Sequence, residues 1–216
     1  MAFKLPIKNR AGFTVPELAI VAGLLALLSL FSAQMLGQSL KSYRTGHQLV
    51  NMQDAAAKGS REFEGKVRYA EQIIVASDTT FSFKAYIANT QRPAPTLITF
   101  SLEGEELLRS IIQPTESSIY PGQYEWTSPP EEKVIVKGLR NQANAESLFS
   151  YYTDNNYNYQ DDTATMIDII NPTDLAELSR IKMVRMNMTI DFNPSLSPGA
   201  IDETTLVSLR NLKLNL

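Results

Sequence analysis

The sequence predicts an α+β fold, in which one long N-terminal helix packs on a C-terminal head of antiparallel β-strands. Two observations carry this prediction. No charged residue occurs from Leu18 to Ala33, and apolar residues continue at helical spacing beyond that run. From about Ile73 onward the apolar residues instead alternate with polar ones, which is typical of strands with one buried face.

The first twelve residues form a short basic leader. They contain Lys4, Lys8 and Arg10 and no acidic residue. Basic flanks stay on the cytoplasmic side of a membrane, so we expect residues 1–12 to remain inside and the rest to be exported. A secretory signal would be cut after its apolar segment, whereas here we expect the cut before it. The apolar segment would therefore be retained.

Residues 13–35 are predicted to be the transmembrane part of the helix. At 1.5 Å per residue they would span about 35 Å, which is enough for a hydrocarbon core of about 30 Å. Residues 36–71 are predicted to continue the helix in amphipathic form, because apolar side chains recur every three or four positions. This stripe consists of Leu36, Leu40, Tyr43, His47 and Val50. We expect one helix from about Thr14 to about Ala70.

Residues 72–216 are predicted to form the β-rich head. The clearest alternation runs over 184–192, and shorter alternating runs cover 81–87 and 98–102. Further candidate strands are 107–112, 133–139, 147–153 and 204–214. Segments rich in proline and glycine separate them, at 88–95, 113–132 and 193–203. A single helical turn is expected over 173–178.

Glu17 is the unusual residue of the N-terminal segment. A carboxylate at the edge of an apolar membrane helix costs free energy and commonly marks function, with a partner nearby. A cut after Gly12 would make Phe13 the new N-terminus, and its amine would lie one helical turn from Glu17. Gly12 suits a cut because glycine has no Cβ and fits a narrow protease subsite. A neighbouring subunit shifted along the helix could present its own amine to Glu17.

The motif Gly12-Phe13-Thr14-x-x-Glu17, followed by an apolar helix, resembles the processing site of type IV prepilins and type II secretion pseudopilins. This resemblance implies that a prepilin peptidase cuts after Gly12 and N-methylates Phe13, and that Glu17 supports assembly with other subunits. It also implies a pilin-like fold and an inner-membrane assembly platform as partner. The alternative that makes no use of the motif is an ordinary signal anchor with a chance glutamate.

A second, softer resemblance concerns the head. The segments 149–154, 181–192 and 207–211 are similar to parts of larger minor pilins and of the J-type pseudopilin. A minor pilin acting in initiation or at the tip of a type IV pilus-like filament is therefore expected. A type II secretion pseudopilin, and a membrane-anchored adhesin or binding domain, stay open as alternatives. The expected location is the cytoplasmic membrane with an exported head, and then a surface pilus or a periplasmic pseudopilus.

Composition narrows the functional classes. The net charge is −3, and loss of the three basic residues of the leader changes it to −6 (−3 − 3). This balance argues against nucleic acid as a default partner. The chain has no cysteine and one histidine, His47, which favours a packing role for that residue. We see no nucleophile–base set, so we expect neither an enzyme nor a cofactor.

One loop has a weak calcium-binding pattern. Asp154, Asn156 and Asn158 supply oxygen atoms at alternate positions, as the first ligands of an EF-hand loop do. Tyr159 stands where such a loop needs glycine, and Thr165 stands where it needs a bidentate glutamate. A plain polar turn is therefore the favoured interpretation. Trp126, among prolines, fits either an exposed contact or loop packing.

Overall fold

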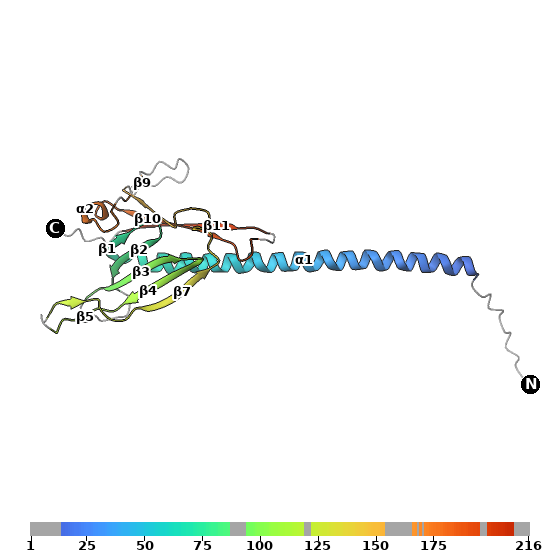
Figure 1. Cartoon of the computed structure of the whole chain (residues 1–216), viewed down its shortest axis with the longest axis horizontal. Coiled ribbons are helices and arrows are strands. Elements are labelled where there is room, and N and C mark those ends of the chain that lie inside the picture. The colour runs from blue at the N-terminus through green and yellow to red at the C-terminus, as the bar shows by residue number, and fades with distance from the viewer. Residues whose placement is uncertain are drawn as a thin grey trace, which may run out of the picture. The chain divides into compact units, whose positions relative to one another are not determined.

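The computed structural model describes residues 14–86, 94–118, 122–153, 166–167, 169, 171–194 and 198–209. The chain divides into two compact units, Met1–His47 and Gln48–Leu216. Helix α1 (Val15–Val67) contributes to both units, and the second unit adds antiparallel β-sheets to it (Figure 1). The predicted α+β architecture, with a long apolar N-terminal helix, is confirmed.

The larger sheet of the head has five antiparallel strands in the order β1-β2-β3-β4-β7. Its strands are β1 (Ala70–Ala76), β2 (Thr80–Ala85), β3 (Thr96–Glu103), β4 (Glu106–Ile112) and β7 (Glu131–Lys137). The predicted helix end near Ala70 is slightly late, because Ala70 already pairs with Ala85 in β1. The sequence prediction placed the start of β-structure at Ile73, since β1 does not alternate cleanly.

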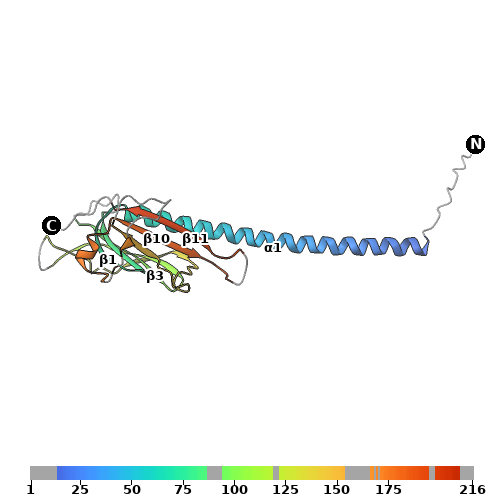
Figure 2. The same ribbon diagram turned by 90° about the horizontal axis from the view of Figure 1, so that it is seen from above.

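The second sheet has four strands in the order β11-β10-β8-β9. They are β8 (Phe149–Tyr152), β9 (Met166–Ile167), β10 (Met183–Ile190) and β11 (Ile201–Ser208), and β10 and β11 lie side by side (Figure 2). The expected helical turn is α2 (Leu175–Leu178), capped by Asp174. Strand β11 begins before the predicted residue 204, because the consecutive polar residues 202–205 give no alternation that would mark its start. The predicted residues 210–214 of this strand lie outside the described residues.

A small ribbon interrupts the connection between β4 and β7. It pairs β5 (Thr115–Glu116) with β6 (Tyr124–Glu125), in a segment that the sequence prediction assigned to turns. The Gly122 N–H donates to the Glu116 carboxylate at 3.0 Å, and Gly122 has φ +82°, which suits glycine. Strands of two residues leave no periodic signal, so alternation could not reveal them.

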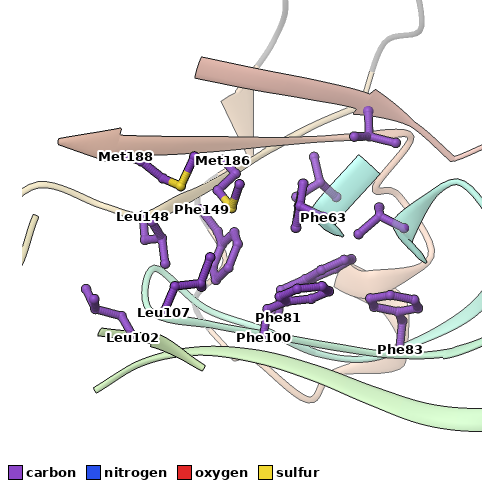
Figure 3. Packing of buried hydrophobic residues seen from close by; sticks show 14 of the residues in the cluster. Phe63, Phe81, Phe83, Phe100, Leu102, Leu107, Leu148, Phe149, Met186 and Met188 are labelled. Atoms are coloured by element: carbon purple, nitrogen blue, oxygen red, sulfur yellow. The ribbon is translucent and has the colours of Figure 1, made fainter. Parts of the chain in front are cut away.

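The C-terminal part of α1 provides the centre of the head core. Its buried side is formed by Met52, Ala56, Gly59, Phe63 and Val67, at helical spacing. The Phe63 ring stacks on Phe149 of the second sheet, with centroids 5.7 Å apart, and meets Phe100 of the first sheet edge-on at 5.4 Å (Figure 3). This part of the helix thus holds both sheets on one core.

Gly59 permits the close approach of α1 to both sheets. A Cβ at this position would lie 2.7 Å from Val136 Cγ2 in β7 and 2.9 Å from Met188 Sδ in β10. Both distances are too short for a real contact. Glycine weakens an isolated helix, whereas at position 59 its missing Cβ lets the helix pack closely against both sheets.

Two polar residues tie loops to the sheets. Asn141 is fully buried; its Nδ2 donates to the Asn187 carbonyl at 2.9 Å, and its Oδ1 accepts from the Thr189 N–H at 3.0 Å. The Asn141 side chain therefore bonds to the backbone of β10 at residues 187 and 189, where β8 no longer pairs with that strand. The Tyr151 hydroxyl donates to the Ser77 carbonyl at 2.8 Å. Burial, reinforced by the charge of Asp78, raises the pKa of Tyr151 well above its ordinary value.

Candidate functional site

The predicted processing site lies at the start of α1. Gly12 and Phe13 fall outside the described residues, whereas Thr14 and Glu17 fall within them. The geometry of cleavage and N-methylation at Phe13 is therefore not part of the described structure. Glu17 is described together with its immediate neighbours.

Thr14 and Glu17 form a reciprocal capping box at the helix N-terminus. The Thr14 N–H and its hydroxyl both donate to Glu17 Oε2 at 2.9 Å, and the Glu17 N–H lies 3.4 Å from Thr14 Oγ1. A threonine followed three residues later by glutamate is the usual sequence of such a box. This capping role was not predicted from the sequence, although the Thr-x-x-Glu spacing is the signal for it.

Only one oxygen of the Glu17 carboxylate is used in the box. Both bonds from Thr14 reach Oε2, and Oε1 accepts no hydrogen bond among the described residues. Four ion pairs occur in the described part of the chain, and none of them includes Glu17. The charge of Glu17 therefore has no cationic partner within that part.

Pro16 is accommodated without the loss of a helical hydrogen bond. The helix begins at Val15, so Pro16 is its second residue, and the first backbone bond runs from the Leu18 N–H to the Thr14 carbonyl at 3.1 Å. The N–H that proline lacks belongs to the first turn, where it would have no intrahelical acceptor.

The apolar part of α1 is exposed at every residue from 18 to 35 in the described structure. Its most apolar 18-residue window has a mean hydropathy of 2.1 and is 0% buried, and by length and composition α1 could cross a membrane. The Ser29 and Ser32 hydroxyls donate to the carbonyls of Leu25 and Leu28, each at 2.8 Å. Both hydroxyls are thus satisfied within the helix, as an apolar environment requires.

The candidate calcium-binding loop is not among the described residues. Asp154, Asn156 and Asn158 lie outside the described residues. Within the described part of the chain, no group of three acidic or histidine side chains could hold a metal ion.

His47 lies near Tyr43 on the helix, with ring centroids 6.3 Å apart. The expected packing role of His47 is not tested by this contact.

Trp126 packs back onto the first sheet. Its Nε1–H donates to the Pro95 carbonyl at 2.9 Å, and the Lys84 ammonium lies 3.5 Å from the centroid of its ring. Partial burial lowers the pKa of Lys84. The loop-packing interpretation of Trp126 is therefore correct.

Comparisons with known proteins add no family. No protein-family model matches the chain, and no curated protein matches its sequence significantly.

Proposed function

We propose that this chain is a structural subunit of a type IV pilus-like filament, a minor pilin that acts in initiation or at the tip. In this proposal a prepilin peptidase at the cytoplasmic membrane removes residues 1–12 and methylates Phe13. The subunit then enters the fibre from an inner-membrane assembly platform, with its apolar helix among those of other subunits.

The observation that carries the proposal is Glu17 at the start of an exposed apolar helix. A carboxylate in such surroundings needs hydrogen bonds and an opposite charge. Thr14 supplies two hydrogen bonds to one oxygen but no charge. The free amine of Phe13 on a neighbouring subunit would supply that charge and would fix the axial register between the two subunits.

The competing explanation is that Glu17 only caps its own helix. Two substitutions separate these roles. Glu17→Gln keeps the capping box, because glutamine also closes such a box, but removes the charge. Thr14→Ala keeps the charge but removes the hydroxyl, and losing a threonine cap costs about 1 kcal/mol of helix stability.

The test measures how much of each variant enters filaments sheared from native cells, by quantitative mass spectrometry. We expect Glu17→Gln to abolish incorporation, and Thr14→Ala to reduce it only partly. Thr14→Ser serves as the matched control, since it retains a capping hydroxyl. If Glu17→Gln enters filaments normally while Thr14→Ala fails to enter them, Glu17 acts as a helix cap and the pairing mechanism is refuted.

The N-terminal peptide of the same samples tests processing. A peptide that begins at N-methylated Phe13 in sheared fibres is the expected result. The processed form found only in membranes would favour the type II secretion pseudopilin. Retention of residues 1–12 would contradict filament assembly and favour a membrane-anchored binding domain.

A further inference from the structure

A polar groove crosses the outward face of the four-stranded sheet. It has a volume of about 400 Å³, and Arg185, Asn187 and Thr189 of β10 line it at alternate positions. Alternate residues of a strand share one face, and four residues of strand cover about 13 Å. The groove therefore extends about that distance from Arg185 to Thr189.

The Arg185 end of the groove is cationic. The guanidinium carbon lies 5.2 Å from the centroid of the Tyr152 ring, which holds the planar group in place. Arg185 Nε is buried and has no hydrogen-bond partner. Among the described residues Arg185 forms no ion pair. This end of the groove thus carries a positive charge that no described acidic side chain pairs with.

The Thr189 end is anionic. Thr189 Oγ1 lies 3.0 Å from Glu146 Oε2 and 2.8 Å from Asp202 Oδ1. A hydroxyl has one proton and can donate to only one of these carboxylates at a time. The second carboxylate keeps its acceptor sites for a ligand, and neither forms an ion pair among the described residues.

Asn187 lies midway along the groove. Its Oδ1 accepts a hydrogen bond from the Thr204 hydroxyl at 3.1 Å, which fixes the orientation of the amide. The amide nitrogen therefore keeps its two N–H groups as donors. A peptide carbonyl is a suitable acceptor for them.

We propose that this groove binds an extended peptide segment of a partner protein. A basic side chain of the segment contacts Glu146 and Asp202, and an acidic side chain four residues away contacts Arg185. An extended chain covers the distance between these charges with the same four-residue spacing as β10. The proposal is independent of assembly through Glu17, so either can fail without the other.

Two peptides of identical composition test it on the full-length chain in detergent micelles. The first, acetyl-Lys-Ala-Ser-Ala-Asp-amide, has its charges four residues apart. The second, acetyl-Ala-Lys-Asp-Ser-Ala-amide, has them adjacent. We expect the first to bind about fivefold more tightly, as two partly exposed ion pairs allow. Binding is followed by NMR shifts of the Asn187 side-chain amide.

Three variants locate the effect. Arg185→Gln, and Glu146→Gln combined with Asp202→Asn, should each remove the preference for the first peptide. Arg180→Gln is the matched control, because Arg180 is exposed and does not line the groove. Equal binding of both peptides by the native chain would overturn the proposal, and so would a preference that survives in both groove variants. The comparison of the two peptides on the native chain needs no variant, so a misfolded variant cannot affect its result.

Discussion

The apolar side chains of α1 are exposed in its N-terminal half, whereas those on one side of its C-terminal half are buried. In the N-terminal unit every described residue from Thr14 to Arg44 is exposed, and Phe31 is 62% exposed. In the head, Phe63 of the same helix is 0% exposed and contacts aromatic rings of both sheets. Local structure is identical in the two halves, so the difference lies in what surrounds them.

This difference shows what the chain needs from outside. Burial of apolar surface drives folding, and a long apolar surface left exposed marks a contact with lipid or with another protein. The two sheets of the head cover the buried apolar side chains of the C-terminal half of α1. Among the described residues nothing covers the N-terminal half, which is the physical basis for proposing contact with a membrane and then with helices of other subunits.

The largest expected effect comes from Phe63→Ala. Loss of this buried ring should lower the free energy of unfolding of the head by about 3–5 kcal/mol. Urea unfolding of the full chain in detergent micelles, followed by the fluorescence of the single tryptophan, Trp126, measures it. Phe31→Ala is the matched control and should leave this value unchanged. Equal destabilisation by both substitutions would contradict the division between the two halves.

Next in size is Glu62→Gln, which tests the charges of the helix. Glu62 Oε2 pairs with Arg109 Nη1 at 2.9 Å, and the Arg109 side chain is only 9% exposed. Leaving that guanidinium without its partner should cost about 2 kcal/mol, somewhat less than for a fully buried pair. Glu64→Gln, which breaks the exposed pair with Arg68, should cost less than about 0.5 kcal/mol. A similar cost for both would show that the Arg109 pair contributes no more than a surface pair.

Glycine-to-alanine substitutions should have opposite signs in the two halves. Gly59→Ala places a methyl group against Val136 and Met188 and should destabilise the head by about 1–2 kcal/mol. Gly46→Ala meets nothing within 4 Å and should stabilise its part of the helix by up to about 1 kcal/mol. Hydrogen exchange of the helix amides, measured on both variants, distinguishes the two signs. Stabilisation by Gly59→Ala would mean that α1 does not approach the sheets so closely.

The smallest effect concerns pH and belongs to the head alone. The pKa of Tyr151 is raised above its ordinary value of 10.0, so folding favours the neutral phenol. Its contribution is complete below about pH 10 and is lost as the pH rises further, because the unfolded chain ionises first. Tyr151→Phe should cost about 1 kcal/mol at neutral pH, through the lost hydrogen bond to Ser77. Its stability should then converge with that of the native chain above pH 10, and parallel curves would contradict this assignment.

Much of the fold could be predicted because its signals are local. A helix and a strand have different side-chain periods, so the apolar spacing of α1 and the alternation along β10 identify both elements within a few residues. The capping box at Thr14 and Glu17 was not predicted, although its signal is equally local, since it depends on residues three apart. The ends of the strands were predicted less accurately, because pairing with a neighbouring strand, rather than composition, determines where a strand stops.

By itself, therefore, the sequence determined the long helix, its apolar N-terminal half, the alternating strands and the position of Glu17. Only the tertiary structure decided that Phe63 joins two sheets, that Glu62 meets Arg109 from 47 positions away and that Trp126 packs on Lys84. It also brought Glu146, Thr189 and Asp202 together. These contacts join residues distant in the chain, and their formation depends on strand order and close packing, which no local period encodes.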